Sequence, residues 1–302
     1  MNTTTRSKQL PFPTWVDNTL LKAFRSCDRK AYWEGFRKQT LKGGNVHLHA
    51  GGAFAHGLEV ARRAFFEQGV AHDDAVALGL EALIKAYGTF ETPDSSAKSW
   101  ERMSGALDFY FQEWPMNTDA VQPLTIEGKR TVEFSFSTAI PGTHHPSTGE
   151  PILYAGRTDM IGAYEGANFI VDEKTTSQLG ATWASQWQIQ SQFKGYTWSA
   201  QQYGYDVTGS IIRGIAIRKT GYDKAEAIVY HTKREIDEWL CQTQRTLDRM
   251  IESWRRGEWH MNLGDVCSAY GGCGFRALCE APDPEPYLGI YYEPRDWNPL
   301  HK

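Results

Sequence analysis

Two aspartates and a lysine lie close together around a short reversal of the chain. The stretch "GRTDMIGAYEGANFIVDEKTT", residues 156–176, predicts a β-hairpin with its turn at Glu165-Gly166. The ladder of this hairpin pairs residues that are equally far from the turn, so Asp159 faces Asp172 with Cβ atoms about 5 Å apart. Because side chains alternate along a strand, Lys174 lies on the same side of the sheet as Asp172.

This spacing indicates a site for a hard divalent cation. Two bare carboxylates at such a distance repel each other unless one takes up a proton or a cation sits between them. Oxygen ligands of this kind suit Mg²⁺ or Mn²⁺, which keep positions open for water and phosphate oxygens. The alternative is an acidic hairpin at the surface, with Lys174 as a solvated partner of Asp159 and Asp172.

The same residues resemble a nuclease signature. "GRTDMIG…FIVDEKTT" resembles the D-(x)n-(D/E)-x-K pattern of the PD-(D/E)XK nuclease superfamily, in its RecB-like branch. The resemblance implies that Asp159 and Asp172 are metal-binding and catalytic, that Glu173 is a further metal ligand and that Lys174 is catalytic. Strand alternation, however, points Glu173 to the opposite side of the sheet.

Two flanking motifs of that branch occur in the same chain order. "GGAFAHGLE" looks like the helical motif that adds a histidine to the metal site, which implies that His56 is a ligand. "QSQFKGYTWSAQQYG" looks like the Q-x-x-x-Y motif, and its spacing of four puts Gln192 and Tyr196 on one helical face. The alternatives are an ordinary helical histidine and ordinary polar packing. Glu133 is a looser candidate for an acid behind the metal site, or a solvent-facing strand residue.

The cysteines form a second constellation. Cys267, Cys273 and Cys279 are spaced evenly, and Cys27 in "FRSCDRKAYW" resembles the early cysteine of iron–sulfur RecB-like nucleases, including the AddB-type and CRISPR-adaptation exonucleases. That resemblance implies a 4Fe-4S cluster that joins the two ends of the chain. Here five residues separate the first two late cysteines, where many relatives have two. Zinc and dispersed reduced thiols remain alternatives, and Cys241 is interpreted as a small packing residue.

The pattern of the remaining chain predicts an α/β fold. Helices are expected over 17–38, 51–69, 73–87, 97–113, 182–203 and 233–256, and strands over 126–140, 156–176, 209–219 and 225–231. This order favours a mixed central sheet flanked by helices, which is the restriction-endonuclease-like core of the PD-(D/E)XK superfamily. One nuclease domain, 1–302, would comprise a helical part (17–122), a catalytic core (123–232) and a cysteine-bearing segment (233–302).

Composition limits the function classes. The 302 residues have 41% hydrophobic content and a formal net charge of −4, so the chain is not a generally basic nucleic-acid coat. It has no apolar run long enough to span a membrane, and its first residues lack the apolar core of a signal peptide. We therefore expect a cytoplasmic protein without a membrane partner.

Together these observations predict a metal-dependent deoxyribonuclease. The expected substrate is DNA, as single strands or duplex ends, hydrolysed by an exonuclease in recombination, repair or replication. No Walker A pattern occurs in the sequence, so a helicase or recombination partner would be a separate chain. One alternative is a non-catalytic nucleic-acid-binding or assembly protein with the same fold, and another is a zinc-stapled enzyme of unrelated chemistry.

Overall fold

Two compact units make up the chain. The computed structural model describes residues 10–126, 128–269, 272–295, 298 and 300. The first unit lies within residues 1–43, 136–156 and 237–302, and the second within 44–135 and 157–236. Each unit is therefore built from segments that are distant in sequence. Whether they act as the single nuclease domain expected for 1–302 stays a prediction.

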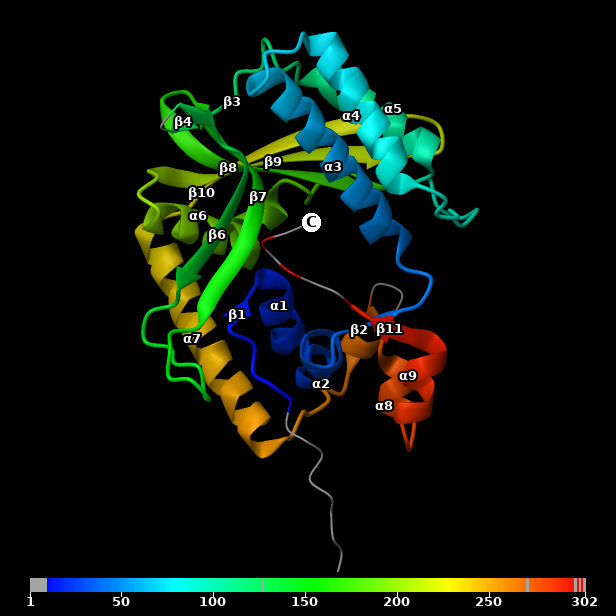
Figure 1. Cartoon of the computed structure of the whole chain (residues 1–302), viewed down its shortest axis with the longest axis vertical. Coiled ribbons are helices and arrows are strands. Elements are labelled where there is room, and N and C mark those ends of the chain that lie inside the picture. The colour runs from blue at the N-terminus through cyan, green and yellow to red at the C-terminus, as the bar shows by residue number, and fades with distance from the viewer. Residues whose placement is uncertain (1–9, 127, 270–271, 296–297, 299, 301–302) are drawn as a thin grey trace, which may run out of the picture. The chain divides into compact units, whose positions relative to one another are not determined.

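The second unit carries the central sheet and its covering helices (Figure 1). Its helices are α3 (Val46–Phe66), α4 (His72–Tyr87), α5 (Trp100–Glu113) and α6 (Ser191–Gln202), preceded by a 3₁₀ turn (Ser185–Ile189). Its strands are β3 (Gln122–Pro123), β4 (Thr125–Ile126), β5 (Lys129–Arg130), β8 (Ala167–Thr176), β9 (Val207–Ile217) and β10 (Tyr222–Tyr230). Three elements cross between the units, namely β6 (Val132–Ala139), β7 (Leu153–Tyr164) and α7 (Lys233–Arg256).

The sheet is mixed, as predicted. Its strand order includes β7-β8-β9-β10, with β3 and β6 also paired to β7. β7 and β8 are antiparallel, β8 and β9 are parallel, and β9 and β10 are antiparallel. A parallel pair needs a crossover connection, and α6 supplies it between β8 and β9. The prediction of an α/β fold with a mixed sheet flanked by helices is confirmed.

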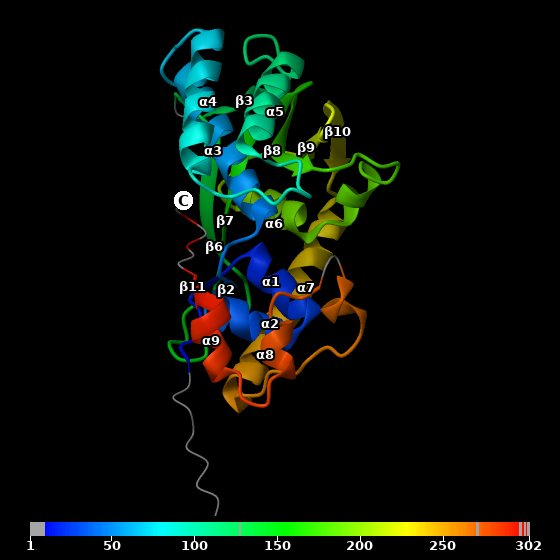
Figure 2. The ribbon, with the colours of Figure 1, turned by 90° about the vertical axis from the view of Figure 1, so that its right-hand side faces the viewer.

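Helices cover both faces of the sheet, so its central strands are apolar on both sides. Figures 1 and 2 show α3, α4 and α5 grouped on one face and α6 on the other. Ile215 of β9 belongs to the buried cluster of α3, α4 and α5, whereas Ile212, three residues earlier in the same strand, packs with Phe193 of α6. Alternate side chains of β8 and β9 consequently enter two separate cores, which matters for the charged residues described below.

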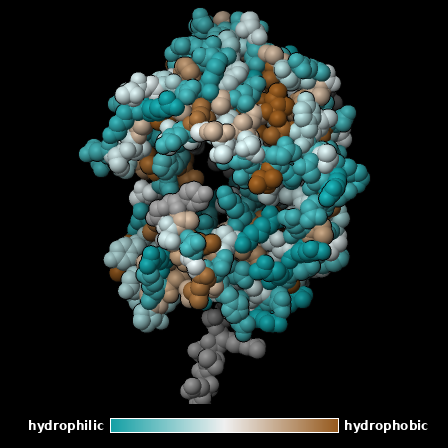
Figure 3. Space-filling view, turned by 180° about the vertical axis from the view of Figure 1, so that it is seen from behind, coloured by the Kyte–Doolittle hydropathy of each residue, from teal (hydrophilic) through white to brown (hydrophobic). Residues whose placement is uncertain are grey.

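The surface seen in Figure 3 is mostly hydrophilic, and its hydrophobic residues lie in small separate groups. Among the helices that the structure describes, none combines the length and the apolar character needed to cross a bilayer.

The first unit joins early and late segments of the chain. Its elements are β1 (Trp15–Val16), α1 (Asn18–Ser26), α2 (Asp28–Ala31), a π-helical turn (Tyr32–Phe36), β2 (Gln39–Leu41), a 3₁₀ turn (Asp265–Cys267), α8 (Arg276–Glu280), α9 (Glu285–Tyr291) and β11 (Tyr292–Pro294). β2 pairs with β11 in antiparallel register, and Trp33 shares a buried cluster with Phe275 and Leu278. Strand pairing and apolar packing therefore hold these two ends together.

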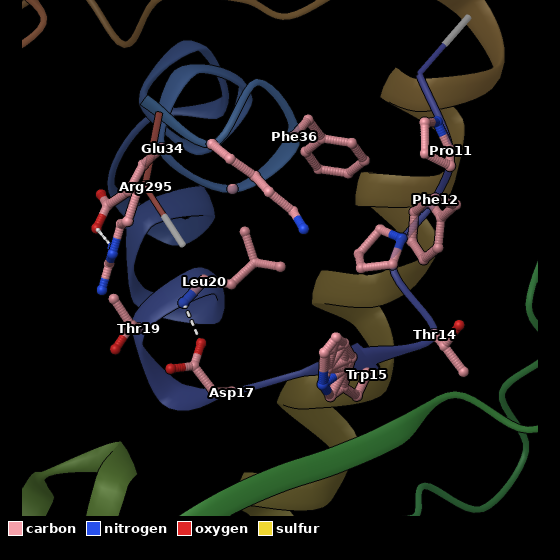
Figure 4. Close-up of a pocket in the computed structure, with 13 residues that line it drawn as sticks. Pro11, Phe12, Thr14, Trp15, Asp17, Thr19, Leu20, Glu34, Phe36 and Arg295 are labelled. Atoms are coloured by element: carbon pink, nitrogen blue, oxygen red, sulfur yellow. Dashed lines mark hydrogen bonds and ion pairs between the residues drawn. The ribbon is translucent and has the colours of Figure 1, made fainter. Parts of the chain in front are cut away.

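A small pocket of about 230 Å³ lies inside the first unit, between the N-terminal segment and Arg295. Figure 4 shows Asp17 at the start of α1, where its carboxylate accepts a 2.7 Å hydrogen bond from the Leu20 N–H. Glu34 and Arg295, which also line the pocket, form an ion pair of 3.1 Å. The first contact stabilises the start of α1, and the second joins the π-helical turn to Arg295, which directly follows β11.

Most predicted elements agree with the structure to within a few residues, but the strand expected over 126–140 is divided into β4, β5 and β6, and two predicted helices are interrupted. The helix expected over 17–38 breaks at Cys27, whose φ of −167° and ψ of 122° are extended. The helix expected over 182–203 breaks at Gln190, which is also extended and separates the 3₁₀ turn from α6. Helical periodicity continued across both breaks, so the sequence pattern did not reveal them.

The crossing of α3 and α4 depends on two facing glycines, which gives a first prediction. A Cβ atom on Gly57 would lie 2.8 Å from the carbonyl oxygen of Gly79, whereas a Cβ on Gly52 of the same helix would meet nothing within 4 Å. We expect Gly57→Ala to lower the free energy of unfolding by about 1–3 kcal/mol through overpacking. Gly52→Ala should raise it by about 0.5–1 kcal/mol through helix propensity.

Denaturant unfolding of the two variants measures both effects. Because the substitutions are chemically identical and lie in one helix, equal stability of the two variants would show that the close approach of α3 and α4 is absent in solution.

Candidate active site

The hairpin of β7 and β8 has the predicted register. Met160 pairs with Val171 and Tyr164 pairs with Ala167, so residues equally far from the turn face each other. The turn residues Glu165 and Gly166 have φ of 48° and 81°, the pair of positive values that a two-residue type I′ turn requires. The paired ladder ends at Met160 and Val171, and Asp159 and Asp172 are the next residues of the two strands beyond it.

Asp172 is buried and Asp159 is half-buried beside Lys174. Asp172 is 4% exposed, and its carboxylate forms an ion pair with the ammonium of Lys174. The carboxylate of Asp159 accepts a 3.1 Å hydrogen bond from the backbone N–H of Glu173. Strand alternation and a two-residue turn thus place two carboxylates and an ammonium group at one point of the sheet.

The electrostatics of this point favour positive charge. Burial, followed by repulsion from Asp172, Glu173 and Glu133, holds the pKa of Asp159 well above its ordinary value. Burial also raises the pKa of Asp172, although Lys174 opposes this increase. Burial alone would lower the pKa of Lys174, but the attraction of Asp172 and Asp159 raises it. The site therefore has more carboxylate charge than its ammonium can balance.

Glu133 is a third acid near Asp159. Its side chain is 4% exposed and forms a 2.7 Å ion pair with Arg157 of β7. The residue has a φ of 56°, which is unusual for a non-glycine residue inside a strand. This backbone conformation turns a residue that would otherwise alternate toward solvent into the interior, so the solvent-facing interpretation is wrong.

Gln192 and Tyr196 reach the same carboxylate from α6. The side-chain amide of Gln192 donates to the Asp172 carboxylate at 3.4 Å and to the Tyr196 hydroxyl at 3.2 Å. Lys174 also lies over the ring of Phe193, with its nitrogen 5.7 Å from the ring centroid. The structure therefore brings five of the residues singled out in the sequence together: Asp159, Asp172, Lys174, Gln192 and Tyr196.

Glu173 belongs to a different charge network on the opposite face of β8. Its carboxylate pairs with Arg62 of α3 and accepts a 2.8 Å hydrogen bond from the Tyr110 hydroxyl of α5. Burial would raise the pKa of Glu173, but Arg62 and Tyr110 hold it below its ordinary value. Both oxygens are occupied on the helix side, so the structure corrects the expectation that Glu173 binds the active-site metal.

Sequence reasoning missed the partner in this network. Arg62 is 4% exposed and lies one turn after Leu58 on the apolar stripe of α3. A charged residue on a buried helical face indicates that an opposite charge must lie beside it. Glu173, an acid within an apolar strand, was a candidate for that opposite charge. Arg213 of β9 is also buried and donates to Asp119 at 2.8 Å.

His56 lies on α3 but is not joined to the aspartates. Its imidazole is 42% exposed and lies 3.9 Å from the carboxylate of Glu59. Within the part of the chain that the structure describes, no three His, Cys, Asp or Glu side chains form a group that could hold a metal ion. The assignment of His56 as a ligand stays a prediction.

The four selected cysteines all lie in the first unit. Cys27 is buried at the break between α1 and α2, and its sulfur accepts a hydrogen bond from the Asn262 N–H at 3.4 Å. Burial raises the pKa of Cys279, and Cys273, Cys27 and Cys267 add to this increase. Each of the other three thiols is therefore near enough to Cys279 to influence its charge.

Comparison with known proteins places the sequence in a family. The profile of the PD-(D/E)XK nuclease superfamily matches residues 19–280. A solved structure from Eubacterium rectale named "Putative exonuclease" is similar with a TM-score of 0.48 and 14% identity, over 85% of this chain and 88% of that one. The solved structure of SSO0001 has a TM-score of 0.32 and 13% identity, over 87% and 94% of the respective chains. No curated protein matches the sequence.

The buried pair of Glu173 and Arg62 gives a second prediction. Glu173→Gln leaves the Arg62 guanidinium buried beside a neutral amide, so it should lower the free energy of unfolding by about 3–5 kcal/mol. Glu113→Gln is the matched control, because the partly exposed pair of Glu113 and Lys224 should contribute less than about 1 kcal/mol.

Thermal and urea unfolding without added divalent cation are the appropriate measurements. If Glu173→Gln unfolded like the wild type and instead weakened Mn²⁺ binding in calorimetry, Glu173 would be a metal ligand and its assignment to a structural pair would be wrong.

Proposed function

The chain belongs to the PD-(D/E)XK nuclease superfamily, and we propose that it hydrolyses phosphodiester bonds of DNA with the help of Mg²⁺ or Mn²⁺. The observation that carries this proposal is the placement of Asp159, Asp172 and Lys174 at one point of the β7–β8 hairpin. Phosphodiester hydrolysis needs groups that bind a cation, orient a water molecule and balance the charge that develops on the phosphate.

The residues at this point fit a divalent cation. Burial, together with the neighbouring carboxylates, holds the pKa of Asp159 well above its ordinary value, so the charged carboxylate favours an added positive charge beside it. Asp159 and Asp172 would hold the ion, with His56 as a further ligand suggested by the family motif. Mg²⁺ is commonly bound by only one or two carboxylates, with water and substrate phosphate completing its shell. When bound, the ion would supply Lewis-acid activation of the phosphate and its attacking water.

The remaining side chains position Lys174 and the substrate. Asp172 holds the Lys174 ammonium, and Gln192 holds the other side of that carboxylate through its amide. Tyr196 accepts a hydrogen bond from the same amide, which fixes the Gln192 rotamer. Lys174 is thereby placed to orient the attacking water and to balance negative charge on the phosphate during hydrolysis.

The substrate assignment rests on the resemblance to RecB-like nucleases. We propose an exonuclease that acts on DNA ends or single strands in recombination, repair or replication, with any helicase supplied by a separate chain. The alternative is a binding or assembly protein that keeps the nuclease fold without turnover. The side chains proposed to act in catalysis from the hairpin, Asp159, Asp172 and Lys174, lie close together, which supports the enzyme.

Lys174→Ala is the direct test of this proposal. Removing one charge-stabilising donor should reduce hydrolysis of end-labelled single- or double-stranded DNA with Mg²⁺ or Mn²⁺ by about 10²–10³-fold. Lys85→Ala, which removes an exposed lysine on α4, serves as the control and should keep wild-type activity. Equal degradation by wild type and Lys174→Ala would contradict the assignment, and a wild type that binds DNA without degrading it would favour the binding protein.

We propose a second, structural cofactor in the first unit. Cys27, Cys267, Cys273 and Cys279 would hold a 4Fe-4S cluster, with zinc as the rival occupant. Four thiols suit either the 4Fe-4S cluster or zinc. Cys27, Cys267 and Cys273 all contribute to the raised pKa of Cys279. A group bound by Cys27 and by the late cysteines would reinforce the joint that β2 and β11 already make.

The fifth cysteine offers a matched control for this cofactor. Protein purified without oxygen should contain iron and acid-labile sulfide with visible charge-transfer absorbance, and Cys27→Ser should lose much of both. Cys241→Ser, which alters the cysteine of α7, should keep the wild-type content. Zinc without iron in the wild type would identify the rival, and a metal-free, fully folded wild type would overturn both assignments.

A further inference from the structure

The second unit contains a pocket with a strongly basic lining. Its volume is about 770 Å³. It lies among the first turn of α3, the loop before α5 and the segments that follow β8 and β9. Its lining residues with polar or charged side chains are His47, Ser95, Ser96, Lys98, Ser177, Gln178, Arg218 and Lys219.

The charge of this lining is one-sided. Lys98, Arg218 and Lys219 are basic, and no aspartate or glutamate is among the described residues that line the pocket. The whole chain, by contrast, has a net charge of −4. One acid outside the lining, Asp223, does contact a lining residue. Arg218 pairs with Asp223 at 3.0 Å, where both side chains are about half exposed, and such exposed pairs are weak.

Lys98 is the most unusual residue of the pocket. It is only 4% exposed, and its ammonium donates to the backbone oxygen and the hydroxyl of Thr175 at 3.2 and 3.0 Å. Among the described residues no carboxylate pairs with it, and burial lowers its pKa to about 8. Lysine is almost never buried without a counter-charge, because the desolvated ammonium is costly. An anion in the pocket would offset that cost.

The pocket flanks the proposed active site without overlapping it. Thr175 follows Lys174 in β8, and the two side chains point to opposite faces of the strand. The lining segment that starts at Ser177 lies three residues beyond Lys174, which is about 10 Å along an extended chain. In duplex DNA each strand has one phosphate per about 3.4 Å of helix axis, so that distance corresponds to roughly three nucleotides of a duplex.

We propose that this pocket binds a phosphate group of the substrate strand a few nucleotides from the cleaved bond. The inference rests on the proposed nuclease function and adds a substrate contact to it. The hydroxyl and amide groups of Ser95, Ser96, Ser177 and Gln178 would donate to phosphate oxygens, while the basic side chains balance the charge. The phosphate is either a backbone diester or the monoester at a strand end, and both present the same oxygens.

Binding in a catalytically silent background tests the pocket directly. The double substitution Arg218→Gln and Lys219→Gln is introduced into the Lys174→Ala protein, and binding of a fluorescent oligothymidylate is measured without added metal. We expect roughly tenfold weaker binding. The slope of log K against log salt should fall by about 0.7 for each phosphate that the protein no longer neutralises. A double substitution of exposed basic residues elsewhere in the unit, Lys85→Gln and Arg234→Gln, should leave affinity and slope unchanged.

Three oligothymidylates distinguish the two sources of phosphate. A larger loss of affinity for a 5′-phosphorylated or 3′-phosphorylated strand than for one with hydroxyl ends identifies a terminal monoester, and an equal loss identifies the backbone. Lys98→Met is a second variant, checked for folding by circular dichroism, and should weaken binding in the same assay. Unchanged affinity and salt slope in the Arg218 and Lys219 variant would overturn the inference.

The outcomes also separate this inference from the proposed function. If wild-type protein bound DNA through the pocket but did not hydrolyse it, the pocket would stand and the nuclease proposal would fail. If the wild type hydrolysed DNA and the pocket variant bound DNA with wild-type affinity, the nuclease proposal would stand and the inference about the pocket would fail.

Discussion

Strand β8 must bury charges on both of its faces, and the surrounding structure is arranged around that constraint. Its first half is apolar, with Phe169, Ile170 and Val171 all buried. It then continues through Asp172 and Glu173, which are buried as well. Each buried ion costs several kcal/mol unless a counter-charge meets it. Because neighbouring side chains enter different cores, a single cation cannot serve both acids.

The two faces solve this problem with different elements. On the α6 face, the counter-charge of Asp172 is Lys174, two residues along the same strand, so the pair is formed by local geometry. On the other face, Glu173 depends on Arg62, which is 111 residues away and is carried by α3. The position of α3 therefore matters for β8, and the close approach of α3 to α4 at Gly57 helps to set it. A register slip of one residue would exchange the two acids between faces and separate Glu173 from Arg62, whereas Asp172 would keep its local pair with Lys174.

This difference also explains which features could be predicted from the sequence. The hairpin register, the facing of Asp159 and Asp172 and the side of Lys174 follow from a two-residue turn and strand alternation. Arg62 could not be paired with Glu173, because nothing local relates two residues so far apart. The inward turn of Glu133 requires a positive φ that strand periodicity hides. The extended backbone of Cys27 was hidden in the same way by helical periodicity on both sides.

The distribution of counter-charges bears on where a cation would be held. Three of the four acids in this region already have a basic partner, since Glu173 meets Arg62, Glu133 meets Arg157 and Asp172 meets Lys174. Among the described residues, the contact of Asp159 is instead with a backbone N–H. Burial and the neighbouring acids raise the pKa of Asp159, so its charged form is the one that an added cation would stabilise most. In the proposed nuclease, Asp159 and Asp172 would hold a divalent ion that activates the phosphate, and Lys174 would orient the attacking water and balance negative charge on the phosphate.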